Sequence, residues 1–243
     1  MGVKFLNKSG VGYLVDGARA IDYALGHGAK VINCSWGYSY NSATLSNVML
    51  KAEQMDVAIV CAAGNYNSET PLYPAYYSYT IAVAAVDQYG YKASFSNYGS
   101  NVDLAAEGVS VYSTYPGNQY ATMSGTSMAA PKVAGLLAAA WSDQTQLGLS
   151  QILQQIPQAA VDVTDPLHSG TSAFAGKDKY TGYGLLSLSN LLTTLGSSAQ
   201  SISVASFSST RLDNLMNYPN PVGAGASTTF GFSADTNVDD TVK

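Results

Sequence analysis

Two runs of almost uninterrupted apolar residues, at 57–63 and 80–86, constrain the fold of this chain more than any other feature. Strands that are apolar throughout must be covered on both faces, as happens in parallel sheets. Apolar residues at a helical spacing occupy 14–27 and 43–55, on either side of a further apolar strand at 29–35. This alternation predicts an α/β domain with three layers, in which a mainly parallel sheet lies between helices.

Further expected elements include a short strand at 3–6, short β pieces between 91 and 125, and a long apolar helix at 127–141. Pro131 falls in the first turns of that helix, where a missing N–H costs least. After residue 195 the composition turns to Ser, Ala and Gln, which is typical of a linker. We therefore expect one large domain at 1–195, a linker at 196–214 and the beginning of another unit at 215–243.

Composition excludes some classes of protein. Charged residues make up 11% of the 243 residues, the net charge is −5, and Lys and Arg form no block, so a nucleic-acid surface is not expected. No apolar run approaches the ~20 residues of a membrane span, and residues 1–12 show no signal-peptide pattern. The low charge, balanced by Ser, Asn, Thr, Gly and 18 Tyr, favours a secreted or cell-surface protein, and we expect a monomer.

The two cysteines, Cys34 and Cys61, both lie inside apolar, β-branched runs. Free cysteines in such runs behave as small apolar residues, so we expect two buried thiols. A metal site needs more ligands than this pair supplies, and we expect none.

The strongest chemical signal is the segment Gly125-Thr126-Ser127, which leads into the apolar helix. A serine at a helix start is ordinarily an N-cap. Here Gly125 lets a substrate backbone approach closely, and the helix N-terminus directs free N–H groups and partial positive charge toward any oxyanion formed at Ser127. The segment therefore indicates a candidate nucleophile.

A second signal lies beyond the carboxyl ends of two expected strands, where parallel sheets bind ligands. Ser35-Trp36-Gly37 follows one strand, and Ala63-Gly64-Asn65 follows the next. An asparagine after glycine is ordinarily a turn residue. At this edge, however, the amide of Asn65 can donate to a developing oxyanion.

Together these motifs resemble the subtilase family of serine peptidases. Six segments agree with the family in order and approximate spacing: 31–37, 62–65, 73–75, 81–87, 95–99 and 125–131, and 182–184 resembles the usual close of its catalytic domain. The resemblance implies the subtilisin-like fold over 1–195. The start of 215–243, Asn-Tyr-Pro-Asn-Pro and then Thr-Thr-Phe-Gly-Phe, resembles a truncated β-sandwich module that sorts or anchors secreted bacterial proteins.

The resemblance also implies roles for individual residues. Ser127 corresponds to the nucleophile, and Asn65 with the Ser127 N–H to the oxyanion hole. Substrate-binding positions are Ser35, Trp36, Gly37, Ala63, Gly64, Gly125 and Thr126. Ala63 and Gly64 would leave the primary specificity pocket open to large apolar side chains. Protein or peptide substrates follow from the family, and calcium is a possible cofactor of it.

The chain also departs from the family pattern. Lys132 stands where His is common, and Glu107 stands where Pro is common. The family places its Asp and His motifs before residue 3, and neither is present here. His27, near a helix end, and His168, in a loop, are not expected to act as the base. Lys132 lies about 140° around the helix from Ser127 by the ~100° turn per residue, so its side chain should diverge.

Two alternatives to an active peptidase remain open. One is a non-catalytic relative kept as a binding or surface module, and the other is an unrelated α/β binding domain. Retention of both Ser127 and Asn65 favours catalytic ancestry. Because no base accompanies Ser127, we expect this chain alone to be inactive.

Overall fold

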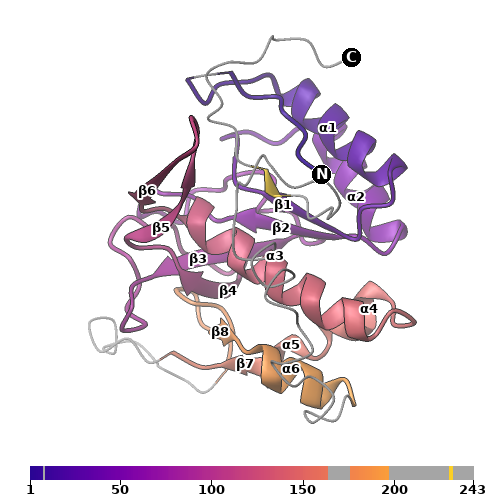
Figure 1. Cartoon of the computed structure of the whole chain (residues 1–243), viewed down its shortest axis with the longest axis vertical. Helices are drawn as coiled ribbons and strands as arrows, with labels where there is room; N and C mark the ends of the chain where they lie inside the picture. The colour runs from indigo at the N-terminus through magenta and orange to yellow at the C-terminus, as the bar shows by residue number, and fades with distance from the viewer. Residues whose placement is uncertain (8, 164–175, 197–229, 232–243) are drawn as a thin grey trace.

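The computed structural model describes residues 1–7, 9–163, 176–196 and 230–231 (Figure 1). The described helices are α1 (Leu14–Gly26), α2 (Ala43–Gln54), α3 (Thr126–Asp143), α4 (Leu149–Leu153), α5 (Ile156–Ala159) and α6 (Leu188–Thr194). The described strands are β1 (Val31–Cys34), β2 (Ala58–Ala62), β3 (Ile81–Val86), β4 (Val102–Glu107), β5 (Val111–Tyr115), β6 (Gln119–Met123), β7 (Ala160–Val161), β8 (Leu185–Leu186) and β9 (Phe230–Gly231).

The main sheet has the order β7-β8-β4-β3-β2-β1-β9, and its central strands are parallel, as the sequence predicts. Of the described strands in this sheet, only β7 and β8 pair antiparallel. Strands β5 and β6 form a separate antiparallel hairpin. Because the central strands are parallel, β1 and β2 end at the same edge of the sheet, and the residues that follow them are brought together there.

Helices cover both faces of the sheet (Figure 1). Alternate residues of β2 show the two layers: Val60 packs into the cluster formed with α3, whereas Ile59 and Cys61 pack into the cluster formed with α1 and α2. Every residue of β2 and β3 is buried. This explains why these strands have no polar position, and it confirms the predicted three-layer α/β fold.

Cys34 and Cys61 are free and buried, and they lie opposite each other in the pairing of β1 with β2. Burial, with the neighbouring Cys34 thiol as the next cause, raises the pKa of the Cys61 thiol well above its ordinary value. The prediction of two buried apolar thiols is confirmed.

These cysteines should resist alkylation in the folded protein. The thiolate is the reactive form, and the raised pKa of Cys61 keeps it protonated below that pKa. We expect iodoacetamide at pH 8 to leave the mass of the folded chain unchanged and to add two carbamidomethyl groups in denaturant. Rapid alkylation without denaturant would show that β1 and β2 open readily.

The prediction of a strand at 3–6 is wrong, because these residues do not form a strand in the structure. A strand needs a hydrogen-bonded neighbour, and among the described residues the outer edge of β1 pairs instead with β9. The linker expected at 196–214 and the module expected at 215–243 lie outside the described residues, except for Gly196 and the two residues of β9. His168 also lies outside them.

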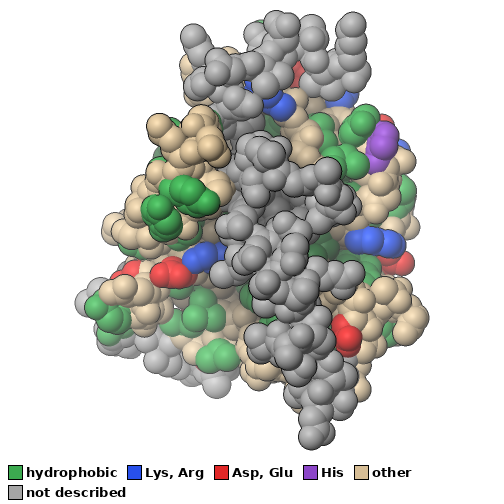
Figure 2. Space-filling model, in the orientation of Figure 1, with side chains coloured by type: hydrophobic (Ala, Val, Ile, Leu, Met, Phe, Trp, Pro, Cys, Tyr) green, Lys and Arg blue, Asp and Glu red, His purple; other side chains and the backbone are tan. Residues whose placement is uncertain are grey.

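Where the face drawn in Figure 2 is not covered by grey atoms, charged side chains are sparse, in agreement with the low charge of the sequence. None of the helices in the described part of the chain is long and apolar enough to cross a membrane.

Candidate active site

Ser127 is the second residue of α3 and lies against the carboxyl end of β1. Its Oγ donates to the carbonyl oxygen of Ser35 at 3.3 Å, and the Ser35 hydroxyl donates to the carbonyl oxygen of Ser127 at 2.9 Å. The hairpin β5–β6 leads into this helix, and its base is closed by a bond from Gly125 N–H to the Gly108 carbonyl, 2.7 Å long. These hydrogen bonds join Ser35 and Ser127, which are 92 positions apart in the sequence, at the edge where β1 ends.

The side chain of Asn65 is held by Thr126. Asn65 Oδ1 accepts two hydrogen bonds of 2.9 Å, from the Thr126 backbone N–H and from its hydroxyl. A backbone N–H can only donate, so the atom facing it must be the amide oxygen. Asn65 Nδ2 therefore points away from Thr126, and it would lie 3.5 Å from a Cβ placed on Gly125. Asn65 is exposed and Ser127 is half-buried, so both are accessible from solvent.

Thr126 itself is fully buried. Its hydroxyl also accepts a hydrogen bond from Gly64 N–H at 3.1 Å. Thr126 can therefore contact a substrate only through its backbone. Its side chain fixes the loop that carries Asn65.

Asn97, to which the sequence motifs assigned no role, holds the same loop from the other side. Asn97 is buried; its Nδ2 donates to the Ala63 carbonyl at 3.0 Å, and its backbone N–H donates to the Gly64 carbonyl at 2.8 Å. Asn97 Oδ1 accepts from Tyr66 N–H at 2.8 Å. Gly64 has a φ of 112°, in the region that favours glycine, and a Cβ there would collide with the Asn97 side chain. In the sequence, the place of Asn97 within the motif at 95–99 is the feature that could have indicated this role.

Trp36 and Gly37 pack against parts of the chain that flank the edge of the sheet. The Trp36 ring meets the Phe5 ring edge-on at 5.0 Å. A Cβ on Gly37 would lie 2.6 Å from Leu72 side-chain atoms, so a larger residue there would require Leu72 to move. Their roles in binding substrate stay predictions.

Two of the three residues that were not expected to act as the base, His27 and Lys132, lie in the described structure, and both have other partners. The His27 ring stacks on Tyr23 at 3.9 Å, and its Nδ1 lies 2.8 Å from the Tyr23 carbonyl oxygen. Lys132 Nζ lies 2.9 Å from Glu107 Oε2, so the two departures from the family pattern form an ion pair with each other. Among the described residues, the hydrogen bond that Ser127 Oγ donates goes to a backbone carbonyl rather than to a base.

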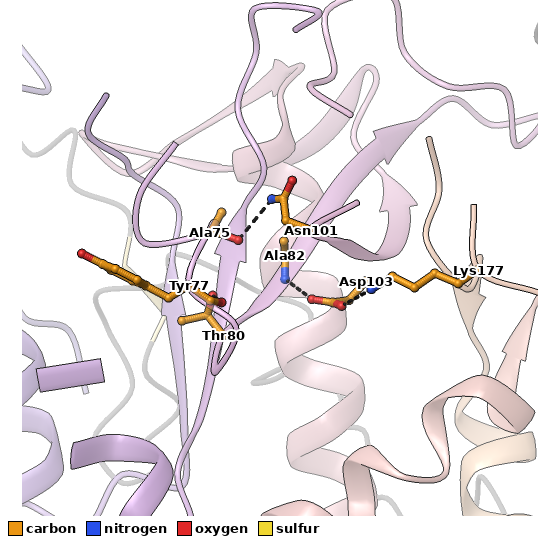
Figure 3. Close-up of polar contacts among 7 residues, drawn as sticks. All are labelled: Ala75, Tyr77, Thr80, Ala82, Asn101, Asp103 and Lys177. Atoms are coloured by element: carbon orange, nitrogen blue, oxygen red, sulfur yellow. Dashed lines mark hydrogen bonds and ion pairs between the residues drawn. The ribbon is translucent and has the colours of Figure 1, made fainter. Parts of the chain in front are cut away.

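Calcium, a possible cofactor of the family, stays a prediction for this chain. In the described ranges, no group of three or more His, Cys, Asp or Glu side chains is placed to hold a metal. The polar cluster in Figure 3 contains one carboxylate, Asp103, whose oxygens accept from Ala82 N–H at 2.9 Å and from Lys177 Nζ at 2.8 Å. The chain's own ammonium therefore neutralises this carboxylate, and we derive no step through a metal.

The site consists of a serine at the start of helix α3 and an asparagine amide beside it, at the carboxyl edge of a parallel sheet. This arrangement is typical of one class of serine peptidases. The chain belongs to the subtilase family of serine peptidases, whose sequence model matches residues 1–184. This confirms the family and the fold that the motifs predict.

Individual relatives agree with this assignment. The chain is 45% identical over 193 residues to the thermophilic serine proteinase of Bacillus sp. (strain AK1), covering 79% of this chain and 45% of that protein. It is 41% identical over 186 residues to thermitase of Thermoactinomyces vulgaris, covering 75% and 63%. The solved structure of sphericase is similar with a TM-score of 0.67 and 34% identity, covering 76% of this chain and 66% of that one. The chain thus spans about half the length of the curated relatives that it matches.

Proposed function

We propose that this chain carries the nucleophile and the oxyanion hole of a serine endopeptidase. Ser127 Oγ attacks the carbonyl carbon of a peptide bond and gives its proton to a base; the amine leaves with a proton, and water releases the acyl group from Ser127. The observation that carries this proposal is the anchoring of Asn65 Oδ1 by Thr126. That anchoring leaves Asn65 Nδ2 as a preorganised donor next to the nucleophile.

The developing oxyanion would accept from Asn65 Nδ2 and from the backbone N–H of Ser127. Both donors are fixed before reaction, so they stabilise the negative charge without reorganising. The N-terminus of α3 adds partial positive charge at the same point. Asn97 contributes indirectly, because it holds the loop that presents Asn65.

The substrates we propose are proteins or peptides bound as an extended backbone along Ser35-Trp36-Gly37. Ala63 and Gly64 would wall the primary specificity pocket, and their small size favours a large apolar side chain. We further propose a secreted or cell-surface monomer with a peptidase domain at 1–195, a linker at 196–214 and a sorting or anchoring module that begins at 215–243.

We propose that the base is not among these 243 residues. A serine hydroxyl is a weak nucleophile at neutral pH until a base takes its proton, and the sequence contains only His27 and His168. His27 is engaged with Tyr23. We therefore propose that the chain alone hydrolyses no peptide bond at a useful rate.

A chimera tests this proposal. The segment of thermitase that precedes its match to this chain, which by family membership carries the Asp and His motifs, is joined ahead of Met1; we call this protein the completed enzyme. The completed enzyme, the chain alone and the Ser127→Ala form of each are assayed on a chromogenic peptide. We expect turnover only in the completed enzyme that retains Ser127.

Two outcomes contradict the proposal in different ways. Turnover by the chain alone that disappears with Ser127→Ala would mean that a base within residues 1–243 reaches Ser127. A completed enzyme that melts cooperatively but shows no Ser127-dependent turnover would favour the rival function, a non-catalytic binding or surface module.

Gly125→Ala should separate stability from activity. The φ of Gly125 is 161°, extended backbone that any residue adopts, and the new Cβ meets its nearest neighbours at 3.5 Å, an ordinary contact. One of those neighbours is Asn65 Nδ2, so the methyl group would stand where the oxyanion has to approach. We expect an unchanged melting temperature and a kcat about 100-fold lower in the completed enzyme, the scale of losing one oxyanion donor. Normal kcat would place the reacting carbonyl elsewhere.

A further inference from the structure

A proline creates an unpaired backbone acceptor at the nucleophile. In an α-helix, each carbonyl accepts from the N–H four residues later. For Ser127 that residue is Pro131, inside α3, and proline has no N–H. The Ser127 carbonyl therefore needs a donor from outside the helix, since buried backbone acceptors that go unpaired cost free energy.

The hydroxyl of Ser35 supplies that donor. Ser35 Oγ lies 2.9 Å from the Ser127 carbonyl oxygen, while the Ser35 carbonyl accepts from Ser127 Oγ at 3.3 Å. These two bonds form a closed ring between the end of β1 and the start of α3. The bond to the Ser127 carbonyl uses the single proton of the Ser35 hydroxyl.

Asn33 contacts the same hydroxyl. Its Nδ2 lies 2.9 Å from Ser35 Oγ. The Ser127 carbonyl can only accept, so the Ser35 proton is used there, and the Asn33 atom that faces Ser35 Oγ must be the donor. In this orientation Asn33 Nδ2 donates to a lone pair of Ser35 Oγ. The proton of the Ser35 hydroxyl is then available to the Ser127 carbonyl.

Asn33 occupies an unfavourable place for a polar side chain. It is 3% exposed, and by strand alternation it faces α3 together with Val31, while Ile32 and Cys34 face the other layer. Its Oδ1 is buried without a hydrogen-bond partner among the described residues. A leucine of similar size would remove this unpaired oxygen and would lose only the single bond to Ser35, so the Asn33 side chain adds little to stability here.

We propose that Asn33 is a positioning residue for the nucleophile, acting through the Ser35 hydroxyl on the carbonyl of Ser127. This inference rests on the proposed function. It adds to the site a residue that touches neither the substrate nor the reacting atoms.

The first test separates this role from a structural one. Asn33→Leu in the chain alone should keep or raise the melting temperature, because it removes the unpaired Oδ1. The same change in the completed enzyme should lower kcat several-fold and leave KM unchanged. Asn33→Asp should lower kcat further, by about 10- to 100-fold, because a carboxylate accepts the Ser35 proton and withdraws it from Ser127. Normal kcat in both variants would overturn the inference, as would a fall in melting temperature for Asn33→Leu with kcat unchanged.

A double-mutant cycle tests the route through Ser35. Ser35→Ala keeps the backbone and removes the hydroxyl, so Asn33→Leu in that background should change kcat no further. Additive losses would mean that Asn33 acts by another route.

The carbonyl ¹³C chemical shift of Ser127, measured in the chain alone, makes the inference independent of the proposed function. It should move in the same direction in Ser35→Ala and Asn33→Asp, as the bond to this carbonyl is lost. An unchanged shift would overturn the inference. If the shift moves but the unaltered completed enzyme shows no Ser127-dependent turnover, the bonding route stands, and the proposed function and the kinetic role of Asn33 both fail.

Discussion

Ser127→Ala in the completed enzyme is expected to lower kcat by about 10⁶-fold and to leave KM nearly unchanged. The magnitude is that known for the triad serine of a subtilisin, which we take over by family membership rather than derive. Its physical reason is that no acyl-enzyme forms without the hydroxyl, so only the oxyanion hole and binding contribute. The measurement is the initial rate on a chromogenic peptide.

Its control is the fold of the variant. Ser127 Oγ donates one long hydrogen bond of 3.3 Å, to the carbonyl of Ser35, so the melting temperature should change little. A variant with normal melting and more than about 1% of the original kcat would remove Ser127 from the mechanism.

Asn65→Ala should lower kcat of the completed enzyme by about 100- to 1,000-fold, again with little change in KM. This range comes from the same kind of oxyanion donor in a subtilisin. Steady-state kinetics distinguishes the two parameters, and an effect confined to KM would mean that Asn65 binds the substrate rather than the oxyanion.

Asn65→Asp is the matched variant. An aspartate keeps an oxygen for the two bonds from Thr126 but replaces the Nδ2 donor with a second, negatively charged acceptor. If Asn65 acts as an oxyanion donor, Asp should be at least as damaging as Ala. Near-normal kcat in Asn65→Asp would show that Asn65 serves only to hold Thr126.

The sequence predicted the parts of this molecule that depend on local pattern and sheet geometry. The fully apolar runs predicted β2 and β3, because a strand buried on both faces has no place for polar residues. Parallel strands end at one edge, so the approach of Asn65 and Ser35 to that edge also followed from the pattern. The meeting of Ser35 with Ser127 is now visible as a pair of hydrogen bonds.

The contacts that orient the site could not be predicted in this way. The bonds from Thr126 to Asn65 join residues 61 apart, and the bond from Asn97 to Ala63 joins residues 34 apart. Neither follows from a periodicity. Lys132 and Glu107, which both depart from the family pattern, form an ion pair with each other. Their positions in the sequence did not indicate this contact.

The expected strand at 3–6 failed for a related reason. A short apolar segment can pattern as a strand, but strand formation requires a hydrogen-bonded neighbour. In the described structure, the edge of β1 is paired with β9 instead. The partner of an edge strand depends on the arrangement of the whole sheet. Local composition does not predict that arrangement.

The most direct test of the central claim is the location of a covalent adduct. The completed enzyme is treated with a fluorophosphonate, digested with trypsin and sequenced by tandem mass spectrometry. Our account predicts a single adduct on Ser127, in the peptide that ends at Lys132, and no adduct in the chain alone. An adduct on another residue of an enzyme that hydrolyses the peptide substrate would contradict the account.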